Sequence, residues 1–160
     1  MSAYITLVTP MLDEDCLVAA IVDQGFREAS IVRSVEPVAL RGWQQGRQAH
    51  IVLLKEHTGD VYNDIGFLRG PTGFTAILSN DYARFGPEWL SRVSARYQAH
   101  WSAKQERLEA EERRRLEEER QRVVEAQRHA VHERAKKMGY AVQEAREGDA
   151  IRLVLVRRTY

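Results

Sequence analysis

The chain has 160 residues, 44% of them apolar, and a formal net charge of +1. This length fits one folded domain with an appendage. The near-zero charge argues against nucleic-acid binding, which usually draws its affinity from a basic surplus. The single cysteine, Cys16, excludes an internal disulfide and a cysteine-based zinc site. No apolar run reaches the roughly 18–20 residues of a membrane span, and no signal-like stretch opens the chain, so we expect a soluble, cytoplasmic protein.

The N-terminal part predicts a strand and then a short helix. Residues 3–9 alternate apolar and polar side chains and stop at Pro10, which is typical of a strand. Asp13 can cap a helix that ends at Gly25. The apolar face of this helix would bury Cys16.

Four further strands are expected before the next helix. Residues 29–40 are rich in Val and Ile but contain Pro37, which favours an edge strand. Residues 50–55 are almost continuously apolar, as in a central strand. Residues 50–55, 64–68 and 74–78 are joined by short, glycine-containing turns and predict an antiparallel meander.

A very long helix should follow, from near Pro87 to Gly139, because nothing between them breaks a helix. Its first turns carry apolar residues at three- and four-residue spacing, which predicts packing on the sheet. Two strands, at 140–145 and 151–157, complete the chain. We therefore predict an α+β fold with a mostly antiparallel sheet and the order β-α-β-β-β-β-α-β-β. The two helix-Gly-aromatic-strand units suggest two related halves sharing one sheet.

Residues 104–122 are the most unusual segment, because fourteen of these nineteen residues are charged. So many charges cannot be buried unpaired, yet the residue types are strong helix formers. Four opposite-charge pairs four residues apart support a solvated helix: Glu109–Arg113, Glu111–Arg115, Arg115–Glu119 and Glu118–Arg122. We predict one domain from residues 1–101 and 138–160, with residues 102–137 as a projecting helical extension.

A few apolar residues are scattered along the charged helix. They recur at steps of seven or eight and fill only half of a coiled-coil seam. A long helix without tertiary contacts is marginally stable, so we predict that these residues bind a partner or a second copy: Leu108, Leu116, Val123 and Val131.

A ligand site is the alternative. Trp43 lies between Arg41 and Arg47 in a glycine-flanked loop, a pattern suited to stacking or anchoring. The alternative, which the sequence favours slightly, is that Trp43 covers one end of the sheet. We include Asp64 and Arg152 in this candidate site. The alternative for the arginines is that they lie on a solvent-exposed face and bind no ligand.

Catalytic and metal sites find little support. His129 and His132 share a helical face, but a zinc site needs three or four ligands. The segment 70–73 resembles a phosphate loop yet lacks its Gly-Lys-Ser/Thr ending. We therefore expect no enzyme activity, cofactor or metal. A hydrolase or transferase would need Asp64, His100 and a basic group in one cleft.

Several short stretches together resemble a known family. They include Arg41-Gly42-Trp43-Gln44-Gln45-Gly46 before an apolar strand, Asp64-Ile65-Gly66-Phe67, Arg96-Tyr97-Gln98-Ala99-His100 on a helix, Gly139-Tyr140, and Ile151-Arg152-Leu153-Val154. In this order and spacing they look like the hypothetical chloroplast reading frame thirty-five family of plastids, cyanobacteria and other bacteria. The resemblance covers nearly the whole chain except about residues 102–130 and implies no established activity. The charged segment looks like an insertion, and Asn63 stands where the family has a tyrosine.

The resemblance also implies a partner, because family members are often encoded near ATPases of the AAA+ type. Such an association is not a mechanism. The leading hypothesis is a non-enzymatic interaction or adaptor protein that engages such an ATPase, another protein or a second copy of itself. A small-ligand or nucleotide-binding regulator is the alternative.

Overall fold

The computed structural model describes residues 4–42, 45–59, 62–79, 83–148 and 150–157. The fold is α+β, as predicted. The chain divides into two compact units, Met1–Glu106 and Arg107–Tyr160, which we call the N-terminal and C-terminal units. Helix α3 (Pro87–Lys137) contributes residues to both. No helix among the described residues has an apolar stretch sufficient to cross a lipid bilayer.

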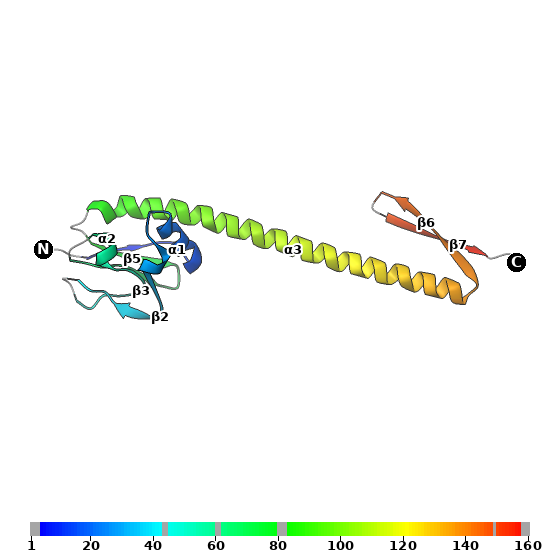
Figure 1. The fold of residues 1–160 in the computed structure, drawn as a ribbon, viewed down its shortest axis with the longest axis horizontal. Coiled ribbons are helices and arrows are strands. Elements are labelled where there is room, and N and C mark those ends of the chain that lie inside the picture. The colour runs from blue at the N-terminus through cyan, green and yellow to red at the C-terminus, as the bar shows by residue number, and fades with distance from the viewer. Residues whose placement is uncertain (1–3, 43–44, 60–61, 80–82, 149, 158–160) are drawn as a thin grey trace. The chain divides into compact units, whose positions relative to one another are not determined.

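The N-terminal unit is built on one antiparallel sheet with the strand order β1-β5-β4-β3-β2 (Figure 1). Its elements, in chain order, are β1 (Tyr4–Val8), α1 (Glu14–Val22), β2 (Ile31–Ala39), β3 (Gln48–Leu53), α2 (Lys55–Thr58), β4 (Ile65–Arg69), β5 (Phe74–Ser79) and the start of α3. The predicted meander and the edge position of β2 are confirmed. The one-turn helix α2, which ends at Gly59 with φ of 76°, stands where the sequence indicated only a turn.

The main core lies between one face of the sheet and the helices α1 and α3. Cys16 is buried in α1, as predicted. Trp89 of α3 packs edge-on against Phe85, with ring centroids 5.3 Å apart. The Tyr97 hydroxyl accepts hydrogen bonds from the backbone N–H groups of Leu12 and Asp13, both at 3.0 Å. The first turns of α3 are therefore fixed to the sheet and to the start of α1.

A smaller cluster covers the opposite face of the sheet. It contains Tyr4, Leu40, Ala49, Val52 and Ile77. Glycine is required at position 66 because a Cβ atom there would lie 2.6 Å from the Ala49 Cβ and 2.8 Å from the Leu40 Cδ1. The glycine of the Asp-Ile-Gly-Phe motif thus lets Leu40 close over β4.

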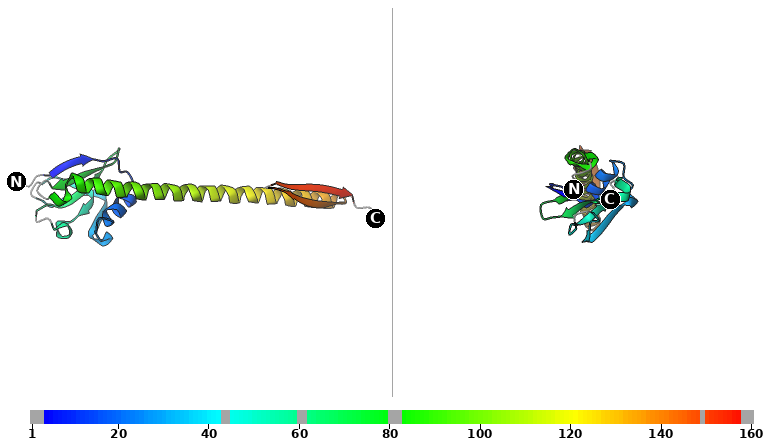
Figure 2. Two further views of the ribbon diagram at one scale, coloured as in Figure 1. Left: turned by 90° about the horizontal axis from the view of Figure 1, so that it is seen from above. Right: turned by 90° about the vertical axis from the view of Figure 1, so that its left-hand side faces the viewer.

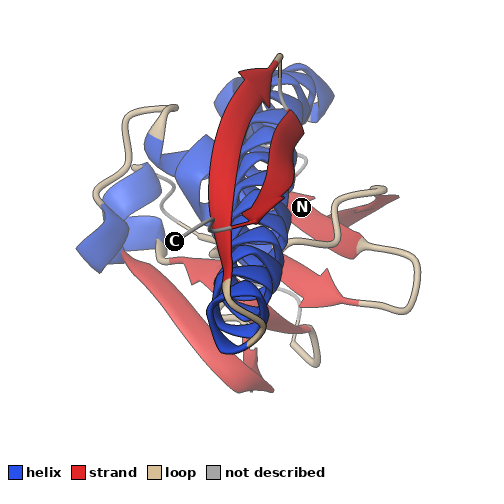
Figure 3. Ribbon diagram, turned by 90° about the vertical axis from the view of Figure 1, so that its right-hand side faces the viewer, coloured by secondary structure: helices blue, strands red, loops and turns tan. Residues whose placement is uncertain are grey.

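The C-terminal unit consists of the rest of α3 and a hairpin of β6 (Tyr140–Glu147) and β7 (Ala150–Arg157). These two strands form a sheet of their own, and Figures 2 and 3 show them beside the last turns of α3. The two halves therefore do not share a sheet, and the division differs from the predicted one (1–101 with 138–160, and 102–137). The physical reason is local: Gly139, at φ of 77°, reverses the chain, and Glu144 then bonds back to α3.

Candidate functional site

A buried carboxylate organises one end of the first sheet. Asp64 is 1% exposed and accepts hydrogen bonds from the backbone N–H groups of Arg41 and Lys55, both at 2.8 Å. The Arg41 guanidinium donates two more, each at 3.2 Å. Both carboxylate oxygens are satisfied, so Asp64 holds the start of β4 to the segment before β3 and to the first residue of α2.

Arg41 is also engaged by a second acid. Its guanidinium donates two hydrogen bonds to Glu56, at 2.8 and 2.5 Å. These bonds hold the pKa of Glu56 at about 2. The hydrogen bonds that the Arg41 guanidinium donates to Glu56 and Asp64 raise the pKa of Arg41 above its usual range. With two carboxylates already bound, this guanidinium is poorly placed to recognise an anion.

The backbone of the Arg41-Gly42 turn is fixed as well. Its carbonyl at Arg41 accepts hydrogen bonds from the Tyr4 hydroxyl at 3.1 Å and from the Asp64 N–H at 2.9 Å. A Cβ at Gly42 would lie 2.4 Å from the Tyr4 hydroxyl and 2.5 Å from the Asn63 Oδ1. These contacts tie the turn to the sheet.

The predicted ligand residues fall in different surroundings. Arg41 and Asp64 contact each other, as described above. Arg47 is half-buried and Trp43 lies outside the described residues. Arg152 belongs to β7 of the C-terminal unit, where it pairs with Glu147 at 3.3 Å. Among the three described candidates of the N-terminal unit, the structure therefore brings together Arg41 and Asp64.

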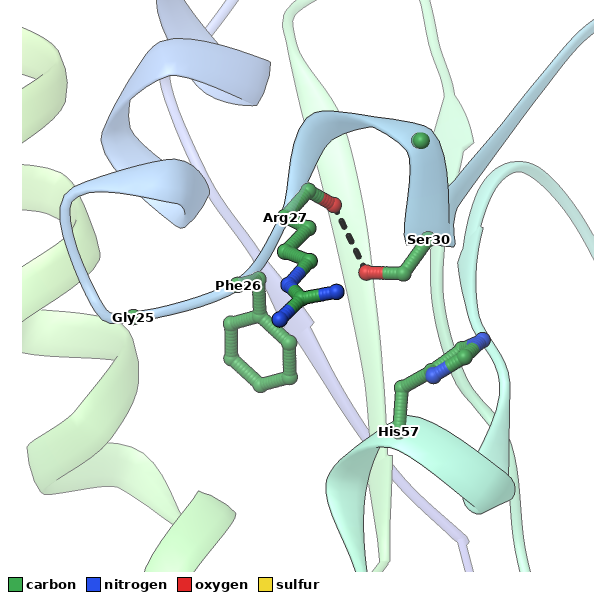
Figure 4. Close-up of a pocket in the computed structure, with 6 residues that line it drawn as sticks. Gly25, Phe26, Arg27, Ser30 and His57 are labelled. Carbon is green, nitrogen blue, oxygen red and sulfur yellow. Dashed lines mark hydrogen bonds between the residues drawn. The ribbon is translucent and has the colours of Figure 1, made fainter.

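A shallow concavity of about 410 Å³ lies elsewhere on the N-terminal unit. Figure 4 shows Phe26, Arg27, Ser30 and His57 around it. The Ser30 hydroxyl donates to the Arg27 carbonyl at 2.6 Å, and no acidic side chain lines the hollow. This concavity could not be predicted from the sequence, because Arg27 and His57 belong to segments that only the fold brings together.

No metal site or catalytic group emerges among the described residues. No group of three or more His, Cys, Asp or Glu side chains is placed there so that it could hold a metal ion. His100 pairs with Asp23 at 2.9 Å, whereas Asp64 contacts Arg41 and backbone groups. His132 bonds to Glu144 at 2.6 Å. Burial raises the pKa of Cys16 to about 11, which disfavours its reactive thiolate.

The C-terminal unit buries very little apolar surface. Ala135, at 3% exposed, is the one buried side chain among its described residues. Leu108 is 46% exposed and Leu116 is 53% exposed. The other large apolar side chains exposed in this unit are Val123, Val124, Val131, Met138, Val154, Leu155 and Val156. All four predicted partner-binding residues are therefore in contact with solvent in a single copy.

Ion pairs connect the hairpin to α3. The Glu144 carboxylate accepts hydrogen bonds from the Arg128 guanidinium and contacts the His132 ring. These bonds, Arg128 first, hold the pKa of Glu144 at about 2. Between the two elements lies a concavity of about 560 Å³, the wedge, lined by Glu117, Arg120, Gln121, Val124, Glu125, Arg146 and Ile151.

Charge pairing along the exposed helix is sparser than predicted. Within α3 the described pairs are Arg114–Glu118 at 3.7 Å and Glu125–Arg128 at 3.2 Å. None of the four predicted pairs forms within this described stretch. Long exposed side chains gain little from such pairs and lose rotamer freedom when they form them. Most charged side chains of the segment 107–122 thus form no ion pair within the described part of the chain.

Comparison of the chain with protein-family models, with curated proteins and with solved structures found no match. The family resemblance accordingly stays a prediction.

Replacing Asp64 with Asn should destabilise the N-terminal unit by about 2–4 kcal/mol, because an amide nitrogen would face a backbone N–H in a buried site. Urea denaturation followed by circular dichroism measures this loss. Glu56→Gln is the matched control, and its effect should be much smaller because that carboxylate is half exposed. Equal effects of the two changes would refute the anchoring role of Asp64.

Glu144 should titrate near pH 2 rather than at its ordinary value of 4.5. Because its folded pKa lies below the unfolded one, its contact with α3 stabilises the hairpin above about pH 4.5 and is lost as the pH falls through 2. NMR titration of the carboxyl group reports the midpoint. In Arg128→Gln the midpoint should move back toward 4.5, and an unchanged midpoint would contradict the ion pair.

Proposed function

We propose that this protein is a non-enzymatic interaction module. Its binding surface is the face of α3 in the C-terminal unit that carries Leu108, Leu116, Val123 and Val131. The N-terminal unit fixes the first turns of this helix through Trp89 and Tyr97 and thereby supports the binding segment.

The scarcity of buried side chains in the C-terminal unit carries this proposal. A unit in which Ala135 is the one buried residue among those described has no hydrophobic core of its own. A two-stranded hairpin and a solvated helix are each marginally stable alone. Burying an exposed Leu or Val side chain contributes about 1.5–3 kcal/mol. A partner that covers several of them would therefore supply the stability that a single copy lacks.

The polar surroundings favour a protein over a small ligand. The surface combines isolated apolar side chains with charges of both signs, as protein interfaces do. The ligand-binding alternative used the loop from Arg41 to Arg47, and the Arg41 guanidinium of this loop already binds Glu56 and Asp64. An ATPase of the AAA+ type, which the family resemblance implies, is one candidate partner.

A photo-crosslinking amino acid at Leu116 tests this proposal in the intact chain. We expect one adduct of discrete mass, formed with a partner protein or with a second copy. The purified complex should also protect the amides of residues 107–137 from hydrogen exchange more than the free chain does. Glu118, which pairs within the same helix, is the matched control position.

The control should give much less adduct, because it lies on the other side of the helix. Equal, diffuse labelling from both positions, without protection of the helix, would remove the basis for an interaction surface there.

A further inference from the structure

We infer that the C-terminal unit pairs with a second copy of itself, with the two α3 helices antiparallel and crossing at Leu116. This inference rests on the proposed function and names its partner. The contact surface is a row of five residues, the ridge: Leu108, Glu112, Leu116, Arg120 and Val124.

The ridge is a geometric property of the helix. Residues four apart lie close together on a helix surface and form the ridges along which helices pack. Residues 108–124 lie within the uninterrupted helix α3. All five side chains are exposed in a single copy, so the helix offers a continuous row of apolar, acidic and basic groups.

The ridge is complementary to itself in one orientation. Its residues read apolar, acidic, apolar, basic, apolar. When a second copy runs antiparallel about Leu116, Glu112 of each chain faces Arg120 of the other and the two Leu116 side chains meet. Leu108 of each copy then approaches Val124 of the other.

The residues that flank Leu116 also have opposite charges at positions symmetric about it. Around Leu116, residues 113–115 are all arginine and residues 117–119 are all glutamate. An antiparallel pair sets Arg113 at the height of Glu119 of the second copy and Arg115 at the height of its Glu117, whereas Arg114 and Glu118 pair with each other on the other side of the helix. A parallel pair in register would set Glu112 against Glu112 and Arg120 against Arg120. Like charges in these positions select against the parallel arrangement.

The charges at the centre are available for such contacts. Within the described part of the chain, no ion pair involves Glu112, Arg113, Glu119 or Arg120. A helix that stabilised itself through internal pairs would have engaged these residues. Their lack of intrahelical partners fits charges held for another molecule.

The wedge is where we expect residues of the second copy to bind. Arg120 and Val124 line this concavity of about 560 Å³ together with Arg146 and Ile151 of the hairpin. In the antiparallel pair, Leu108 and Glu112 of the second copy arrive beside these residues. Leu108 would contact Val124 and Ile151, which are the two apolar residues of the wedge, and Glu112 would contact Arg120.

Charge reversal in the full-length protein tests the orientation. Arg120→Glu places two acidic pairs across the two-fold axis and should weaken the dimer about tenfold or more, measured by sedimentation equilibrium. The double variant Glu112→Arg with Arg120→Glu restores both opposite-charge pairs and should return the dissociation constant close to that of the wild type. Arg122→Glu, off the ridge, is the matched control and should change it little.

A disulfide measures the contact independently of the charges. Leu116→Cys should cross-link two copies under mild oxidation, whereas the wild type should not, because Cys16 is buried. Failure of the double reversal to restore pairing would overturn the antiparallel arrangement. A protein that stays monomeric and forms no Leu116→Cys disulfide would overturn self-association. The proposed function would survive that result if the photo-crosslinker at Leu116 still gave one discrete adduct with another protein.

Discussion

Uneven burial of apolar surface is the constraint on which this structure depends. The N-terminal unit packs its sheet under α1 and the first turns of α3, with Trp89 and Tyr97 as anchors. The C-terminal unit buries only Ala135 among its described residues. Since hydrophobic burial is the main favourable term in folding, the two units cannot be equally stable by themselves. The C-terminal unit also carries most of the large apolar side chains that are exposed among the described residues.

Charge explains why such exposure can be tolerated. The helix between residues 104 and 122 carries seven basic and seven acidic residues, which sum to zero. They keep the surface hydrated, so that Leu108 and Leu116 do not belong to a large contiguous hydrophobic patch. In the proposed dimer the same charges would confer specificity, because their order changes sign about Leu116. In this account one segment keeps the exposed helix soluble and also favours the antiparallel orientation of the two α3 helices.

Much of the fold followed from patterns in the sequence, and the remainder required tertiary information. Alternation and turn residues predicted the meander, Pro37 predicted an edge strand, and the absence of helix breakers predicted α3. The separate hairpin was not predicted, because strand patterns do not specify which strands pair. The role of Asp64 was also missed, since its partners Arg41 and Lys55 lie 23 and 9 residues away. Exposed Leu and Val residues on a charged helix were visible in the sequence alone.

Hydrogen exchange of the wild-type protein over a range of concentrations tests the central claim most directly. If the C-terminal unit is completed by a second copy, protection of residues 107–137 should rise with protein concentration, while protection of the sheet in the N-terminal unit stays constant. Protection of the helix that is the same from the most dilute to the most concentrated sample would contradict the account.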